Sequence, residues 1–282
     1  MARYPRKQPE SHVKRIIGIA LLLLSSPLLA EVSLGEISAE EVIYQAGNTS
    51  LHGYLAHDPQ ITGKRPGVLV VHEWWGHNEY ARERARMLAE LGYVALAVDM
   101  YGGGQLAEHP QEAGAFAGYV RNNMPLAQER FEAALAVLRD HPGVDPERIA
   151  AIGYCFGGQI VLDMARAGLD LSAVASFHGA LATKTPAQPG TIQPRILVLH
   201  GSEDPMIPQE QVLAFIDEME HAEADYRFIA YPGATHSFTN PEAVRSAAEF
   251  GMPIGYHPEA DQASWQELYQ FLRETFRRTS AE

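Results

Sequence analysis

The chain has 282 residues, a formal net charge of −13, one cysteine and a hydrophobic content of 46%. A hydrophobic share of this size can fill a core, which excludes an intrinsically disordered chain. The acidic excess argues against a nucleic-acid-binding protein, because phosphate contacts need clustered lysine and arginine. A single cysteine excludes an internal disulfide framework and a cysteine-rich zinc module. Cys155 is therefore either an inert core residue or a residue with a special role.

The first thirty residues have the pattern of a secretory signal. A basic segment precedes the apolar run 16–24, and the segment 25–30 that follows ends in the small residue Ala30. The run is shorter than the roughly 20 residues that span a bilayer. We therefore expect cleavage after Ala30 and a secreted or periplasmic protein. An uncleaved N-terminal anchor is the alternative, because Leu28 is large for its place in a cleavage site. Removal of this basic segment leaves a more acidic chain, for which we expect no stable membrane contact.

The remaining residues, 31–282, show strands alternating with helices. Apolar runs bounded by turn signals predict strands at 42–45, 51–56, 67–71, 93–98, 149–154, 173–177, 195–199 and 226–230. Amphipathic spacing predicts helices at 78–91, 126–138, 157–167, 209–219 and 264–276. Residues 102–123 are glycine-rich and then weakly helical, and we expect an insertion there. This alternation predicts a single α/β domain with a mostly parallel sheet that helices cover on both faces.

The sharpest motif is Gly153-Tyr154-Cys155-Phe156-Gly157, between a predicted strand and a predicted helix. It is a G-x-S-x-G nucleophile elbow in which cysteine replaces serine. The turn is strained and crowded, so only very small residues fit two positions before and after the nucleophile. The helix that follows directs its N-terminal amides toward the sulfur and favours the thiolate. A buried structural cysteine is the alternative interpretation.

Two further strand ends carry an acid and a histidine. Asp204 comes shortly after the strand 195–199, and His236 comes shortly after the strand 226–230. An α/β-hydrolase presents its nucleophile, acid and histidine in this chain order at the carboxyl ends of strands. We therefore predict an α/β-hydrolase fold with a triad of Cys155, Asp204 and His236. His236 would take the thiol proton and Asp204 would orient the imidazole, with Glu203 as the alternative acid.

The segment 72–77, His-Glu-Trp-Trp-Gly-His, directly follows the strand 67–71. A zinc motif H-E-x-x-H needs two histidines four residues apart on a helix, whereas these are five apart after a strand. We therefore expect neither a metal nor another cofactor. In a hydrolase this loop supplies one oxyanion-hole amide, here that of Trp74, and the second is that of Phe156. Trp75 is expected to wall the acyl pocket, with a structural role as the alternative.

Together with Asp99-Met100-Tyr101 and the segment 234–238, these motifs resemble the dienelactone hydrolase family from about residue 40 to the C-terminus. The resemblance implies hydrolysis of a small ester or lactone through a thioester on the cysteine. It also implies that Glu73 contacts the resting thiol and helps to activate it, since a buried carboxylate can accept a proton. Anchoring of the loop by Glu73 is the alternative. We expect Tyr101 and Phe238 to line the substrate pocket with Trp75.

The sequence departs from the family in two places. Dienelactone-cleaving members hold the substrate carboxylate with arginines, and bidentate arginine contacts are strong. The corresponding segments here, 102–105 and 238–240, contain no arginine. An anionic dienelactone is therefore not the expected substrate, although the hydrolytic residues are retained. A non-catalytic or redox-responsive binding protein on the same fold is the alternative function, because an exported thiol meets an oxidising environment.

Overall fold

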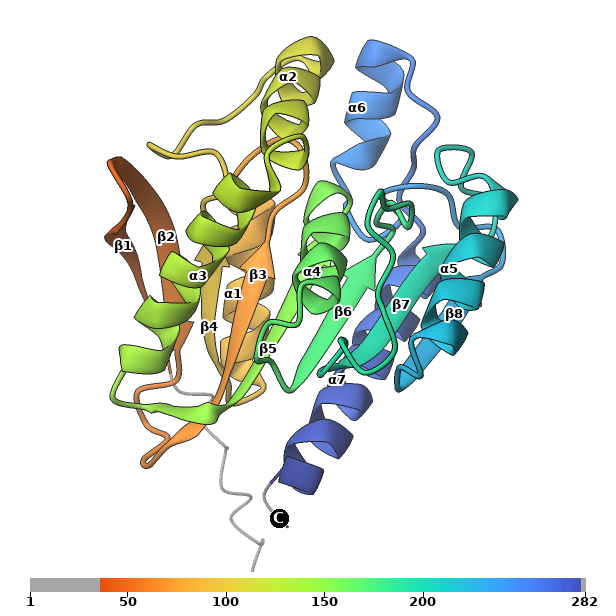
Figure 1. The fold of residues 1–282 in the computed structure, drawn as a ribbon. Helices are drawn as coiled ribbons and strands as arrows, with labels where there is room; N and C mark the ends of the chain where they lie inside the picture. Colours follow the sequence, from red (N-terminus) through yellow and green to blue (C-terminus); the bar gives the residue numbers. More distant parts are fainter. Residues whose placement is uncertain (1–35, 280–282) are drawn as a thin grey trace, which may run out of the picture. The chain divides into compact units, whose positions relative to one another are not determined.

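Eight strands form one sheet within residues 36–279, the part of the chain that this computed structural model describes (Figure 1). The strand order is β1-β2-β4-β3-β5-β6-β7-β8. β1 and β2 pair antiparallel, β2 also pairs antiparallel with β4, and the other neighbours are parallel. All the predicted strands are present. The strands are β1 (Ser38–Ala46), β2 (Thr49–His57), β3 (Arg65–Val71), β4 (Val94–Val98), β5 (Val144–Tyr154), β6 (Ala173–Phe177), β7 (Arg195–Gly201) and β8 (Tyr226–Tyr231).

The helices match the predicted ones with two additions, α2 and α6. α2 lies in the segment predicted as an insertion, and α6 was not predicted, because its eight residues are too few for a clear amphipathic period. α7 starts at Pro258, before the predicted residue 264, and proline is favourable in the first helical turn. The helices are α1 (Glu79–Glu90), α2 (Pro110–Arg121), α3 (Met124–Asp140), α4 (Phe156–Arg166), α5 (Gln209–His221), α6 (Ala243–Phe250) and α7 (Pro258–Thr279).

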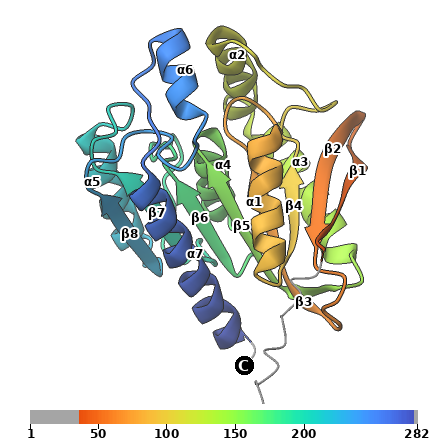
Figure 2. The same ribbon diagram turned by 180° about the vertical axis from the view of Figure 1, so that it is seen from behind.

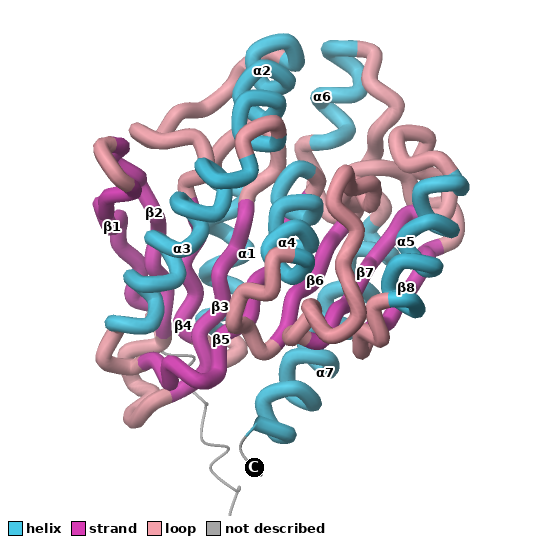
Figure 3. The backbone as a smooth tube through the Cα atoms, viewed as in Figure 1, coloured by secondary structure: helices cyan, strands magenta, loops and turns pink. Residues whose placement is uncertain are grey.

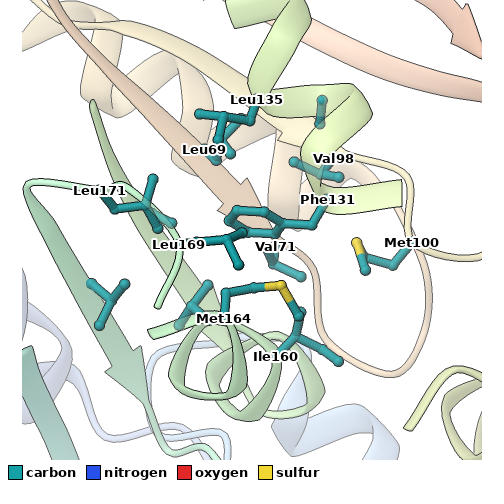
Figure 4. Packing of buried hydrophobic residues seen from close by; sticks show 14 of the residues in the cluster. Leu69, Val71, Val98, Met100, Phe131, Leu135, Ile160, Met164, Leu169 and Leu171 are labelled. Atoms are coloured by element: carbon teal, nitrogen blue, oxygen red, sulfur yellow. The ribbon is translucent and has the colours of Figure 1, made fainter. Parts of the chain in front are cut away.

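Each face of the sheet carries its own apolar layer, because alternate strand residues point to opposite faces. On one face Leu69 packs with Phe131 of α3 and Met164 of α4 (Figure 4). The other face is covered by α1 and α7 (Figure 2), and there Val70 belongs to the layer that contains Leu272 of α7. Each buried side chain of this kind contributes about 1.5–3 kcal/mol to folding. These two layers fix the sheet between the helices and make it a rigid base for the loops.

The parallel strands end at one edge of the sheet. Val71 at the end of β3 pairs with Gly153 of β5, and the last residues of β5 and β6 pair with each other. The last residues of β7 and β8, Gly201 and Tyr231, also pair. Figure 3 shows α2 and α6 at this end of the sheet, next to the loops that follow the strands. The loops predicted to carry the chemistry therefore meet at one edge.

No helix within residues 36–279 is both long and apolar enough to cross a membrane. The predicted secretory signal, residues 1–30, lies outside the described residues.

Candidate active site

Cys155 occupies a sharp turn between β5 and α4, with φ 51° and ψ −111°. This left-handed φ is uncommon for a residue other than glycine and indicates a strained backbone. A Cβ atom on Gly153 would lie 2.1 Å from the carbonyl oxygen of Gly157. A Cβ atom on Gly157 would lie 2.3 Å from the carbonyl oxygen of Val71. The predicted requirement for glycine on both sides of the nucleophile is confirmed.

His236 connects Cys155 with Asp204. Its Nε2 lies 3.1 Å from Cys155 Sγ, and its Nδ1 lies 2.8 Å from Asp204 Oδ2. The second carboxylate oxygen of Asp204 accepts a hydrogen bond from the Met206 amide at 2.9 Å, which fixes its orientation. Asp204 is buried and Glu203 is exposed, so Asp204 is the acid that bonds to the imidazole. The structure thus brings together the three residues that chain order selected.

The two partners of His236 control its protonation. Burial lowers the pKa of an imidazole because the imidazolium loses its hydration. Here the charge and hydrogen bond of Cys155, together with those of Asp204, outweigh burial and raise the pKa of His236 to about 10. A proton held on this imidazole favours negative charge on the neighbouring sulfur, which is the reactive form of a cysteine.

Glu73 is buried beside these residues, with 2% of its surface exposed. Its Oε2 accepts a hydrogen bond from Asn240 Nδ2 at 2.5 Å, and its Oε1 has no partner among the described residues. Burial raises the pKa of this carboxyl against the opposing effects of Asn240 and His236. The family resemblance implied a contact with the resting thiol. In this structure the thiol bonds to His236 and Glu73 bonds to Asn240, and a role of Glu73 in activating the thiol stays a prediction.

The loop after β3 lies against the elbow. Trp74 and Phe156 line the cavity beside the thiol. Phe156 is the first residue of α4, so its amide has no intrahelical acceptor. The Tyr101 hydroxyl donates to the carbonyl oxygen of Trp74 at 2.9 Å, and the amide of Gly157 donates to that of His72 at 3.1 Å. These bonds fix the position of the loop relative to the nucleophile.

A cavity of about 360 Å³ opens beside Cys155. Its wall is mainly apolar, and α2 supplies part of it, so the segment predicted as an insertion borders the site. Arg121 is the only lysine or arginine among its lining residues, and no described aspartate or glutamate lines it. The lining residues are Trp74, Pro110, Ala117, Arg121, Cys155, Phe156, Gln159, Ala180, Met206, Ile207, His236, Ser237, Met252, Pro253 and Ile254.

The three residues expected in the substrate pocket lie elsewhere. Phe238 is fully buried in the apolar layer under the sheet edge. Tyr101 is 5% exposed, and its hydroxyl donates to the carbonyl oxygen of Trp74. Trp75 lines a second hollow with Phe250 of α6, whereas its neighbour Trp74 lines the cavity beside the thiol. Trp74 lines the cavity beside Cys155, and Trp75, Tyr101 and Phe238 are not among its lining residues, so their contact with a substrate stays a prediction.

Two polar residues of the site have no motif in the sequence. His178 follows β6 and is 1% exposed, and its Nδ1 accepts a hydrogen bond from the Cys155 amide at 3.1 Å. Its place directly after an apolar strand was the signal that could have identified it. Arg121 lies in the last turn of α2 and has no ion pair with a described residue. Only the position of α2 over the sheet edge reveals Arg121.

The segment 72–77 has no metal-site geometry. His72 Nε2 accepts a hydrogen bond from the Met100 amide at 3.2 Å, so its Nδ1 carries the proton that is donated to the Glu73 carbonyl at 2.5 Å. Both ring nitrogens are therefore occupied. Within residues 36–279 no three histidine, cysteine, aspartate or glutamate side chains gather as a metal-binding group.

Comparisons with known proteins place the chain among hydrolases. Residues 51–276 match the model of the Dienelactone hydrolase family. A solved structure called m3DLH is 38% identical, covers 86% of this chain and 99% of its own, and has a TM-score of 0.80. A dienelactone hydrolase-like promiscuous phosphotriesterase from metagenomic libraries is 37% identical with the same coverage and a TM-score of 0.78. A Synechocystis protein named "Putative carboxymethylenebutenolidase" is 29% identical over 80% of this chain and 92% of its own.

Proposed function

The chain belongs to the dienelactone hydrolase family, and from this premise we propose that it hydrolyses small esters or lactones through a thioester on Cys155. The observation that carries the proposal is the hydrogen-bonded series from Cys155 Sγ through His236 to Asp204. Nucleophilic catalysis by cysteine requires such a base and such an orienting acid. The cavity beside the thiol offers space for a small substrate.

In the first half of the reaction the sulfur attacks the substrate carbonyl. A carbon–sulfur bond forms, and the carbonyl electron pair moves to oxygen, where the amides of Trp74 and Phe156 donate hydrogen bonds. When the tetrahedral intermediate collapses, the carbon–oxygen bond to the alcohol breaks, and the leaving oxygen takes the proton of the His236 imidazolium. The acyl group stays on Cys155 as a thioester.

In the second half His236, now neutral, takes a proton from water. The hydroxide attacks the thioester carbonyl, the carbon–sulfur bond breaks, and the acid leaves while the thiol–imidazole pair is restored. Because a thiolate leaves readily from the tetrahedral intermediate, a cysteine nucleophile suits substrates with a good leaving group. Activated esters, lactones and thioesters are therefore favoured over amides.

The test is turnover of p-nitrophenyl acetate by the wild-type protein and by Cys155→Ala. We expect the substitution to abolish turnover above the background rate. The sequence has one cysteine, so an acyl group or a thiol-reactive probe that is found on a cysteine must be on Cys155. Intact mass during turnover should show an acetyl adduct on the wild-type protein and none on Cys155→Ala. Full activity in Cys155→Ala would refute the mechanism. A wild-type thiol that labels slowly and does not turn over any ester would instead favour the binding-protein alternative.

A second candidate activity comes from the relative that is named a promiscuous phosphotriesterase. Neutral phosphotriesters suit the mainly apolar wall of the cavity, and the donors of an oxyanion hole can also stabilise negative charge on a phosphoryl oxygen. A panel that contains p-nitrophenyl acetate, a butyrolactone and diethyl p-nitrophenyl phosphate separates the two activities. Release of p-nitrophenol from the phosphate by wild type but not by Cys155→Ala would support the second activity, and no release would restrict the enzyme to carboxylic esters.

A further inference from the structure

His178 links the two loops that carry Cys155 and His236. It follows β6 directly, is 1% exposed, and holds a left-handed backbone with φ 41°. This conformation is unusual for a residue with a side chain, although histidine, asparagine and aspartate adopt it more often than most others. Its own amide donates to the carbonyl oxygen of Leu199 at 2.9 Å, which ties the strained residue to β7. The imidazole therefore has one fixed orientation.

The hydrogen bonds of the ring define its tautomer. The Cys155 amide can only donate, so His178 Nδ1, 3.1 Å away, is the acceptor and carries no proton. The proton is on Nε2, which donates to Thr239 Oγ1 at 2.7 Å. Burial lowers the pKa of His178 well below its ordinary value, and the charges of His236 and Arg84 act in the same direction. The ring is neutral in the state that makes both bonds.

Each of these bonds reaches one half of the catalytic pair. The amide on one side belongs to the nucleophile itself and is shared between His178 and the carbonyl oxygen of Phe177, 3.0 Å away. The residue on the other side, Thr239, lies three positions after His236 and is fully buried. Thr239 Oγ1 is also 2.6 Å from the Tyr80 hydroxyl, so the network continues into α1.

We propose that His178 is a positioning residue that sets the distance between the Cys155 thiol and the His236 imidazole by bonding to both of their loops. This inference rests on the proposed function of the pair. It predicts that loss of the Nδ1 acceptor lets the strained elbow rotate, which slows attack by the sulfur while the cavity that binds the substrate stays unchanged. The defect should therefore lie in kcat and in thiol reactivity, not in KM.

The test compares His178→Ala with His178→Asn. Asparagine tolerates the left-handed backbone, and its side-chain oxygen can accept the Cys155 amide bond in place of Nδ1. We expect His178→Ala to lower kcat and the rate of Cys155 alkylation by iodoacetamide by about 10- to 100-fold, by analogy with the loss of outer-shell residues that orient metal ligands. KM should change less than about twofold, and His178→Asn should recover most of both rates.

Thr239→Val provides a second variant that keeps the shape of the buried side chain and removes the hydroxyl. We expect Thr239→Val to lower kcat and the rate of Cys155 alkylation by a smaller factor than His178→Ala does. The melting temperature and the far-UV circular dichroism spectrum establish that each variant is folded. Wild-type alkylation rates in both His178→Ala and Thr239→Val would overturn the proposal. A loss in His178→Ala that His178→Asn does not recover would also overturn it. Because alkylation needs no substrate, these outcomes remain distinct from a failure to find ester turnover.

Discussion

At the scale of single residues, we propose that the buried carboxylate of Asp204 controls the reactivity of the Cys155 thiol. Asp204 bonds to His236 Nδ1 at 2.8 Å and favours the imidazolium that stabilises the sulfur anion. The substitution Asp204→Asn keeps the shape of the side chain and removes its charge. We expect kcat to fall by about 100-fold or more, as for other triads of this kind. The rate of Cys155 alkylation at neutral pH should fall as well, because the thiolate is the reactive form of a cysteine.

The adjacent acid provides the matched control. Glu203 is exposed, and His236 bonds to the buried Asp204 instead, so Glu203→Gln should leave both kcat and the rate of Cys155 alkylation unchanged. Alkylation is followed by intact mass at a series of pH values, with turnover of p-nitrophenyl acetate measured on the same samples. Equal effects of the two substitutions would contradict the assignment of the acid.

The sequence was sufficient to select Cys155, Asp204 and His236, because each follows an apolar strand and their order along the chain is restricted. The sequence was not sufficient to predict which side chains line the cavity. The direction in which Trp74 or Trp75 points depends on the path of one loop, and this path is fixed by a bond from Tyr101, a residue distant in sequence. A motif defines which residues occur in a loop but does not define the direction in which each side chain points.

At the scale of secondary structure elements, α2 determines the charge of the cavity. Its last turn places Arg121 in the lining, although the segments expected to hold substrate arginines contain none. A free guanidinium at the cavity can bind a carboxylate at the far end of a substrate. Arg121→Gln should lower kcat/KM for p-nitrophenyl hemisuccinate by about tenfold, since a hydrogen bond to a charged group is worth about 1.5–3 kcal/mol before screening. Hydrolysis of neutral p-nitrophenyl butyrate should not change.

Arg121→Lys serves as the control variant, because it keeps the positive charge but removes the planar guanidinium that can bind a carboxylate through two hydrogen bonds. It should retain part of the preference for the anionic ester, and raised salt should weaken that preference in the wild-type protein. Parallel losses for the anionic and neutral esters in Arg121→Gln would show that α2 acts on the cavity through packing alone.

The elements themselves were largely predictable from the sequence. The strands are apolar runs between turn residues, and α3 and α4 have clear amphipathic spacing, so the sheet and most helices follow from local patterns. α6 was missed because it is short, and the position of α2 over the sheet edge was open because it depends on long-range packing. The residues that α2 contributes to the site could not be read from its own sequence for the same reason.

At the scale of the whole molecule, buried imidazoles make the fold sensitive to mild acid. Burial lowers the pKa of His72 to about 4 and that of His77 to about 3, and it lowers that of His178 as well. An unfolded histidine titrates near 6.5, so between pH 6.5 and about 4 the unfolded chain binds protons that the folded chain does not. Stability therefore falls as the pH decreases through this window.

We expect the free energy of unfolding to fall by about 2 kcal/mol between pH 7 and pH 5.5. Each of the three imidazoles with a lowered pKa contributes a loss of roughly 1 kcal/mol, and the raised pKa of His236 offsets about 1 kcal/mol, because folded His236 already holds the proton that the unfolded residue binds in this range. Urea denaturation at the two pH values measures this change, and pH 5.5 is above the range in which ordinary carboxylates titrate. His77→Gln should reduce the difference by about half, since it removes one contribution of roughly 1 kcal/mol. His221→Gln, at an exposed position, should leave it unchanged. A urea midpoint that does not move with pH in the wild-type protein would show that these rings are hydrated or relax on protonation.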